Sequence, residues 1–151
     1  MKTNWKKLLN EGKIQRKGVS FKEVDRVFSR AQRVLKSAEL LLEKDEESAY
    51  QLSYEAMMLA GRALIFSFGL KPRTVGAHAI TVEFCQSILG EKYKLLVEKF
   101  NRARKKRNYL IYGTGIIISP TEAKNLIKTA KEFLNVINEK ILATKKQKKL
   151  I

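Results

Sequence analysis

Residues 46–68, EESAYQLSYEAMMLAGRALIFSF, form the most apolar stretch of this 151-residue chain. Apolar side chains recur there at steps of three and four residues, which predicts a helix. One face of that helix carries Ala49, Leu52, Ala56, Leu59, Ala63 and Phe66, and another carries Tyr50, Tyr54, Met57, Gly61, Leu64, Ile65 and Phe68. A helix that is apolar over so wide an arc contacts several neighbours. We therefore expect it to be the centre of the fold.

The segment before this central helix predicts a second long helix. Ser20 and Glu23 have the spacing of a capping box, which satisfies backbone N–H groups at a helix start. From there, apolar residues keep helical spacing as far as residue 42. Residues 11–20 contain two glycines and several cations, and we interpret them as a basic loop.

Further helices are expected after the central one. Gly69 and Pro72 follow it as C-terminal stop signals. The loop over 70–74 then leads to expected helices over 75–89 and 91–111, and residues 112–118 form a turn with an apolar run at its end. The sequence SPTE over 119–122 is the clearest helix start in the chain, and the last helix extends to residue 141.

These segments show no internal repeat and no alternating strand pattern. The sequence therefore predicts an all-α protein, an antiparallel up-and-down bundle of four to five helices. We divide it into a basic N-terminal arm over 1–20, a helical domain over 21–141 and a Lys-rich C-terminal tail over 142–151. We expect the tail to fray.

The composition is that of a soluble globular protein, with 44% apolar and 30% charged residues. No uncharged run is long enough for a membrane span, and no apolar segment follows the basic N-terminus as in a secretory signal. Cys85 is the only cysteine, so we expect a reducing, cytoplasmic location. With no Cys/His cluster, we expect neither a metal site nor a cofactor.

The net charge of +16 is concentrated in three segments. Residues 1–22 contribute +6, residues 102–107 contribute +5 and residues 140–151 contribute +5, so the rest of the chain is neutral. A chain that is neutral apart from three basic segments suits a polyanionic partner such as nucleic acid or an acidic protein. A solvated, solubilising surface is the alternative.

The candidate functional residues follow from the basic segment RARKKRNYLIYG over 102–113. Helical spacing places Arg107 on the stripe that continues from Leu96 and Phe100, whereas its neighbours point elsewhere. An arginine can bind phosphate through two parallel hydrogen bonds, Asn108 can add another, and Tyr112 can offer a stacking surface. Non-specific attraction is expected from Arg102, Arg104, Lys105 and Lys106. The alternative for Arg107 is an ion pair with a carboxylate of another helix, such as Glu55.

Three further residues form a possible pocket. Glu55 and Arg62 lie seven residues apart on the central helix, so they share one side of it, either as a structural pair or as a pocket wall. His78 is the only histidine, so any histidine-dependent acid–base role falls to it. A surface or capping role for His78 is the alternative.

Residues 49–84 resemble the two central helices of HEPN domains, in which an aromatic- and Ala-rich helix ends near Arg-Ala-Leu and a glycine. Residues 102–112, together with the sequences ISPTEA over 118–123 and AKEFL over 130–134, resemble the end of the same domain. The resemblance covers about residues 21–141. It implies a four- to five-helix bundle, commonly dimeric, with the arginine-bearing helices facing each other across the dimer.

The resemblance also implies a function. Many HEPN proteins are metal-independent ribonucleases, often toxins encoded beside a minimal nucleotidyltransferase, whose active site has an arginine followed four to six residues later by a histidine. Arg107 matches that arginine and Asn108 the polar residue after it, but the histidine position is occupied by Tyr112, or by Gly113 at the longer spacing. A phenol with a pKa near ~10 is only about 0.1% ionised at pH 7, a handicap of roughly 4 kcal/mol for a general base.

Three hypotheses result. The first is a homodimeric protein that binds RNA or a nucleotide, with weak or no cleavage, as a toxin–antitoxin or defence component. The second is a ribonuclease that uses Arg107 with Tyr112 or His78 in place of the missing histidine. The third is a protein-interaction module whose basic surface binds a nucleotidyltransferase or another acidic partner.

Overall fold

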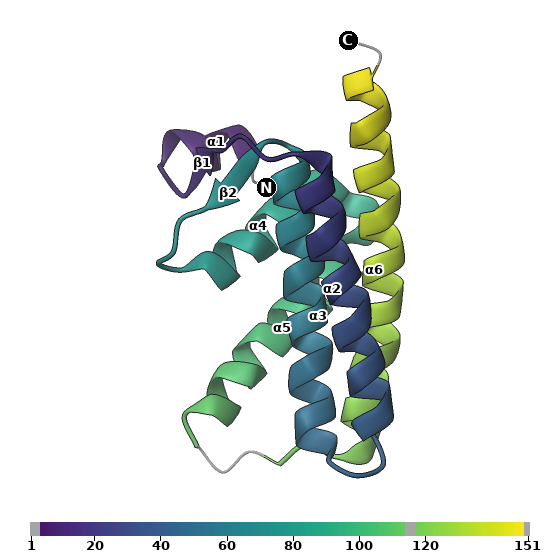
Figure 1. The fold of residues 1–151 in the computed structure, drawn as a ribbon. Coiled ribbons are helices and arrows are strands. Elements are labelled where there is room, and N and C mark those ends of the chain that lie inside the picture. Colours follow the sequence, from purple (N-terminus) through teal and green to yellow (C-terminus); the bar gives the residue numbers. More distant parts are fainter. Residues whose placement is uncertain (1–3, 114–116, 150–151) are drawn as a thin grey trace.

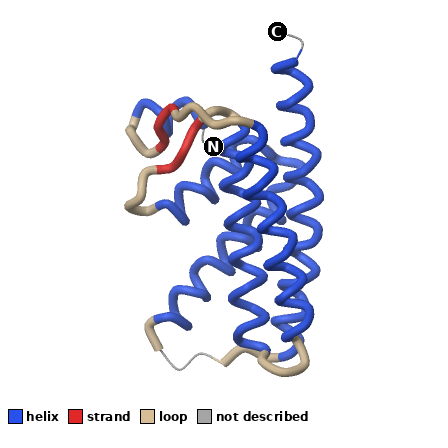
Figure 2. The backbone as a smooth tube through the Cα atoms, in the orientation of Figure 1, coloured by secondary structure: helices blue, strands red, loops and turns tan. Residues whose placement is uncertain are grey.

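The computed structural model describes residues 4–113 and 117–149 of the chain. Its described part is an all-α bundle, with one small sheet added at one end (Figures 1 and 2). The helices are α1 (Trp5–Asn10), α2 (Phe21–Leu41), α3 (Glu46–Ser67), α4 (Ala77–Leu89), α5 (Lys94–Ile111) and α6 (Pro120–Lys149), and a 3-10 turn, η1 (Glu91–Tyr93), precedes α5. The predicted all-α bundle is confirmed.

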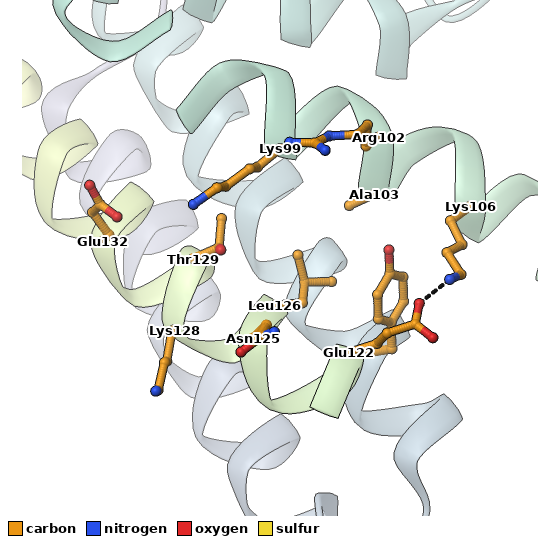
Figure 3. A pocket seen from close by; sticks show the side chains of 11 residues that line it. Lys99, Arg102, Ala103, Lys106, Glu122, Asn125, Leu126, Lys128, Thr129 and Glu132 are labelled. Carbon is orange, nitrogen blue, oxygen red and sulfur yellow. Dashed lines mark hydrogen bonds and ion pairs between the residues drawn. The ribbon is translucent and has the colours of Figure 1, made fainter. Parts of the chain in front are cut away.

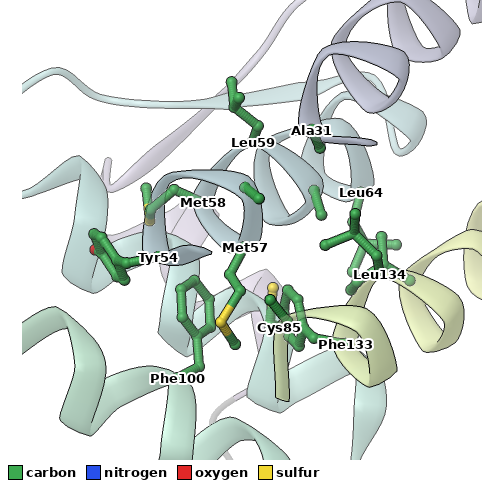
Figure 4. Close-up of a cluster of buried hydrophobic side chains, with 14 of the residues drawn as sticks. Ala31, Tyr54, Met57, Met58, Leu59, Leu64, Cys85, Phe100, Phe133 and Leu134 are labelled. Atoms are coloured by element: carbon green, nitrogen blue, oxygen red, sulfur yellow. The ribbon is translucent and has the colours of Figure 1, made fainter. Parts of the chain in front are cut away.

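Helix α3 is the centre of this bundle, as its wide apolar surface predicts. It contacts α2 and α6, which run beside it along most of its length, and also α4 and α5, which lie to one side (Figure 1). Most of its side chains from Ala49 to Ser67 are buried. The rings of Tyr54, Phe100 and Phe133 bring α3, α5 and α6 together, with Phe100 between the other two (Figure 4).

The predicted helix starts are present as hydrogen bonds. Ser20 Oγ accepts from the backbone N–H of Glu23 at the start of α2, at 3.3 Å. At the start of α6, Ser119 Oγ accepts from Glu122 N at 3.1 Å and Glu122 Oε1 accepts from Ser119 N at 3.3 Å, a complete capping box. This cap fixes the position of the carboxyl group of Glu122, which matters for the site below.

Two strands correct the prediction of loops over 11–20 and 70–74. β1 (Ile14–Arg16) pairs with β2 (Leu70–Pro72) as an antiparallel ribbon, in which Gln15 lies opposite Lys71. Strands of three residues are too short to show an alternating pattern, and these two lie far apart in sequence. The sequence therefore gave no local signal for this pairing.

The N-terminal segment is packed against the domain. Leu8 and Ile14 are buried, and the ring of Trp5 lies edge-on to Phe68 at 5.9 Å. The backbone N–H of Trp5 donates to Ser87 Oγ of α4 at 2.9 Å. The described part of the predicted basic arm is therefore attached to α4, and most of its cations are exposed to solvent.

The C-terminal prediction also needs correction. Helix α6 continues past Ile141 to Lys149 where fraying was expected. Lys145 pairs with Asp25 of α2, and the ammonium groups of Lys145 and Lys148 lie over the ring of Phe21. These contacts extend the helix because they give its last turns a neighbour to pack on.

In the predicted turn over 112–118, Gly113 has a φ of 65° and Ile118 is buried, and residues 114–116 lie outside the described part.

Candidate nucleic-acid site

Helix α5 carries the candidate residues, and different sides of it meet different neighbours. Phe100 and Arg107 both contact the ring of Tyr54 on α3. Val97, Asn101 and Arg104 line a cavity of about 340 Å³ against α4. Lys99, Arg102 and Lys106 line a groove of about 520 Å³ against α6. The basic segment therefore divides into separate sites instead of forming one patch.

Arg107 lies over an aromatic ring. Its Cζ atom is 5.9 Å from the ring centroid of Tyr54, a fully buried residue of α3. This geometry is a cation–π contact. In the part of the chain that the structure describes, no carboxylate comes within ion-pair distance of Arg107, so the pairing with Glu55 considered above is absent. Arg107 is half-buried and keeps its N–H donors for another acceptor.

His78 completes this cluster from the start of α4. Tyr54 Oη and His78 Nδ1 are hydrogen-bonded at 2.8 Å, and the hydroxyl donates when Nδ1 carries no proton. Burial lowers the pKa of His78, and the charge of Arg107 lowers it further. Arg62 and Arg104 act in the same direction, and Glu55 opposes them. Burial also raises the pKa of Tyr54, which keeps its hydroxyl protonated.

The remaining predicted residues lie in different surroundings. Glu55 and Arg62 are half-buried on α3, where their charges reach His78. Asn108 is half-buried and follows Arg107 directly, and its carbonyl accepts from Tyr112 N at 3.2 Å. The side chain of Tyr112 is 82% exposed at the end of α5, so it does not line the Tyr54–His78 cluster.

The α6 side of α5 has a different character. Lys106 Nζ donates to Glu122 Oε2 across the groove, and this pair closes one end of it (Figure 3). The hydrogen bond from Lys106 lowers the pKa of Glu122, and those from Ser119 lower it further. Arg104, on the α4 side, donates to Asn101 Oδ1 at 3.0 Å, and Lys105 is exposed.

Sequence reasoning missed two participants. Helical spacing predicts that Tyr54 lies on an apolar face of the central helix, but its hydroxyl and ring contact His78 and Arg107. Lys99 lies outside the dense basic segment, yet it lines the α6 groove with Arg102. The three-residue step from Lys99 to Arg102 was the signal that could have indicated it.

The described residues contain no group of three or more His, Cys, Asp or Glu side chains able to hold a metal ion. Nor does any helix in the described ranges have the length and apolarity to cross a bilayer.

Comparison with known proteins agrees with this architecture. No curated protein matched the chain. The family model of the HEPN domain matches residues 24–141, which span α2 to most of α6 and include the whole Arg107 cluster. The chain therefore belongs to the HEPN family.

Proposed function

We propose that this HEPN protein binds RNA or a nucleotide through Arg107 and cleaves it weakly or not at all. One observation supports this more than any other: Arg107 is half-buried over Tyr54 with no carboxylate partner among the described residues. Removing a charge from water without a counter-ion is unfavourable, so such an arginine is best explained by an anionic ligand. The planar guanidinium matches a phosphate group.

The surrounding residues favour the same ligand. Arg107, Arg62 and Arg104 lower the pKa of His78 and Glu55 opposes them, so three positive charges act there against one negative charge. Asn108 adds an amide that can donate to phosphate or to a base. The exposed ring of Tyr112 can stack on a base at the edge of the site.

A homodimer is part of this proposal. Ile111 and Tyr112 are 48% and 82% exposed at the end of α5, where the helix points away from α3 (Figure 1). Exposed apolar groups at one place favour an interface. Facing α5 helices would bring two Arg107 sites together. We place the protein in the cytoplasm, as part of a toxin–antitoxin or defence system that can include a nucleotidyltransferase partner.

A second candidate function, metal-independent RNA cleavage, is favoured by the hydrogen bond between His78 and Tyr54. Such cleavage needs a base that takes the proton of the ribose 2′-hydroxyl and an acid that protonates the leaving 5′-oxygen. A His78 of lowered pKa is neutral at pH 7, and in the tautomer whose Nδ1–H donates to Tyr54 Oη it can accept a proton at Nε2. Tyr112 is a poor base because a phenol is rarely ionised at this pH.

The test is incubation of transfer RNA and total RNA with the protein in EDTA, together with binding measurements on the same RNA. Wild type is compared with Arg107→Ala and with Lys124→Ala, which removes one exposed charge from α6. We expect Arg107→Ala to weaken RNA binding about tenfold or more, since a hydrogen bond to a charged group contributes about 1.5–3 kcal/mol. Lys124→Ala should change it less than twofold.

The outcomes separate the hypotheses. Cleavage by wild type that disappears in Arg107→Ala would make the protein an enzyme, and His78→Gln would then test the base. RNA binding without cleavage supports the proposal above. Absence of both with a folded protein would leave the partner-protein hypothesis, which predicts co-purification with a nucleotidyltransferase.

A further inference from the structure

A groove of about 520 Å³ lies between α5 and α6, on a different side of α5 from the Arg107 cluster. Figure 3 shows Lys99 and Arg102 extending from α5 along one wall, with Asn125 and Thr129 on the α6 wall. The pair of Lys106 and Glu122 closes one end, and Glu132 lies at the other.

The groove carries a local excess of positive charge. Lys99, Arg102, Lys106 and Lys128 line it together with two carboxylates, Glu122 and Glu132. One of these carboxylates, Glu122, is already bound by Lys106 and by the helix cap. Within the described residues, neither Lys99 nor Arg102 makes an ion pair or a side-chain hydrogen bond, so their donors are available to an anion.

The floor of the groove is apolar and aromatic. Ala103 and Leu126 line it, together with Tyr50, which is 6% exposed. Burial raises the pKa of Tyr50 to about 12, and the charge of Glu122 contributes. The tyrosine hydroxyl is therefore a neutral donor at pH 7 and does not repel an anionic ligand.

We infer that the α5–α6 groove is a second site for single-stranded RNA, in which Lys99 and Arg102 contact phosphate and the floor accepts a base. The inference rests on the proposed RNA binding, but it assigns a surface apart from Arg107. Single strands are bound by cationic grooves with aromatic or apolar surfaces that accept unstacked bases.

A single strand fits this groove better than the alternatives do. Its volume lies within the range of small-molecule sites, which suits one or two nucleotides. A duplex presents its bases stacked and paired, so it could not place one on Leu126 and Ala103. An acidic peptide would use the cations and leave the amide and hydroxyl groups of Asn125 and Thr129 without a specific role.

The first experiment measures binding of a short oligouridylate by fluorescence anisotropy over a series of salt concentrations. The double variant Lys99→Gln/Arg102→Gln is compared with Lys44→Gln/Lys124→Gln, which removes two exposed charges elsewhere. We expect the groove variant to bind about tenfold more weakly, and the slope of log affinity against log salt to fall by about 1.4 for two lost phosphate contacts. The control pair should change affinity less than twofold.

The second experiment locates the RNA by NMR, with the same oligonucleotide titrated into wild type and into Arg107→Ala. We expect the amide signals of Arg102, Asn125 and Thr129 to shift in both proteins. Shifts confined to the Tyr54 and His78 region of wild type would overturn the inference and leave the proposed function intact. No shift anywhere would overturn both, and equal displacement of the RNA by polyglutamate would overturn the assignment of the groove to RNA.

Discussion

Lys106 and Arg107 are neighbours in sequence, yet the fold gives them opposite surroundings. Lys106 reaches across to α6 and binds Glu122, whose position the helix cap fixes. Arg107 turns toward α3 and lies over Tyr54, with no carboxylate in ion-pair distance among the described residues. One cation thus has an internal partner, and the other is left with donors for an external one.

This difference distinguishes a cation that stabilises the fold, Lys106, from a cation that is available to a ligand, Arg107. An exposed ion pair such as that of Lys106 is worth about 0–1 kcal/mol, and it fixes the start of α6 against α5. A half-buried arginine on an aromatic ring stabilises little by itself, although it sets the potential around His78. In the proposals above, Arg107 therefore binds ligand and Lys106 attaches α6, while the groove beside Lys106 keeps Lys99 and Arg102 for RNA.

The largest effect is expected from a substitution of Phe100, which supports both the Arg107 side and the Lys106 side. Phe100 contacts Tyr54 at 5.9 Å and Phe133 at 4.8 Å between ring centroids, so it joins the two regions. Phe100→Ala should lower the free energy of unfolding by about 3–5 kcal/mol through lost burial and a cavity. Urea denaturation would measure this.

The matched control for Phe100→Ala is Leu95→Ala, because Leu95 is 70% exposed on the same helix. It should change the free energy of unfolding by no more than about 0.5 kcal/mol. Equal losses in the two variants would mean that Phe100 does not join the two regions.

The next effect should act on the Arg107 side alone. Gly61 faces α4, where an added Cβ would lie 2.6 Å from Thr81 Cγ2. Thr81 cannot rotate freely because its Oγ1 donates to Ala77 O at 2.8 Å. Gly61→Ala should therefore push α4 from α3, with a net loss of about 1–2 kcal/mol after the gain in helix propensity.

Thermal denaturation and the NMR signals of His78 would test this, because His78 lies on the displaced helix. Gly18→Ala is the control, since an added Cβ there meets nothing within 4 Å. An unchanged stability of Gly61→Ala would show that the α3–α4 contact is more adaptable than its geometry indicates.

Much of the fold could be predicted because it follows from local pattern. The caps at Ser20 and Ser119 and the wide apolar surface of α3 specify helix starts and a central helix without knowledge of the neighbours. The β1–β2 ribbon could not be predicted, because its strands pair over a long sequence separation and each has three residues. The continuation of α6 depends on contacts with Asp25 and Phe21 of a distant helix.

The candidate site divides in the same way. Helical spacing correctly separated Arg107 from its basic neighbours, because that separation depends on one helix alone. The role of Tyr54 could not be read from the sequence, since it depends on where α4 and α5 cross α3. A tyrosine on an apolar stripe has the same spacing whether its hydroxyl is a core group or part of a site.

A smaller effect concerns His78, whose pKa is lowered by burial and further by the charge of Arg107. The unfolded chain has the ordinary value near 6.5 and takes up a proton first as the pH falls. The free energy of unfolding should therefore decrease as the pH falls below about 6.5. Because His78 is the only histidine, NMR titration of its ring protons gives its pKa directly.

Arg107→Gln should raise the pKa of His78 by removing a positive charge, whereas Lys106→Gln should leave it unchanged. Glu55, Arg62 and Arg104 remain in both variants and continue to act on His78. A pKa in wild type at or above 6.5, or equal shifts in the two variants, would contradict the contrast between the two cations.

The smallest effect tests the Lys106 side. Glu122→Gln removes the ion pair with Lys106 and should cost at most about 1 kcal/mol, because the two side chains are 30% and 39% exposed. The pKa of Glu122 is lowered, so its contribution is present above the ordinary value of 4.5 and is lost as the pH falls below it. The difference between wild type and Glu122→Gln in urea denaturation should therefore shrink from pH 7 to pH 3. Glu139→Gln, an exposed change on the same helix, should show no such trend. A pH-independent difference for Glu122→Gln would mean that the negative charge of Glu122 does not help to hold α6 in place.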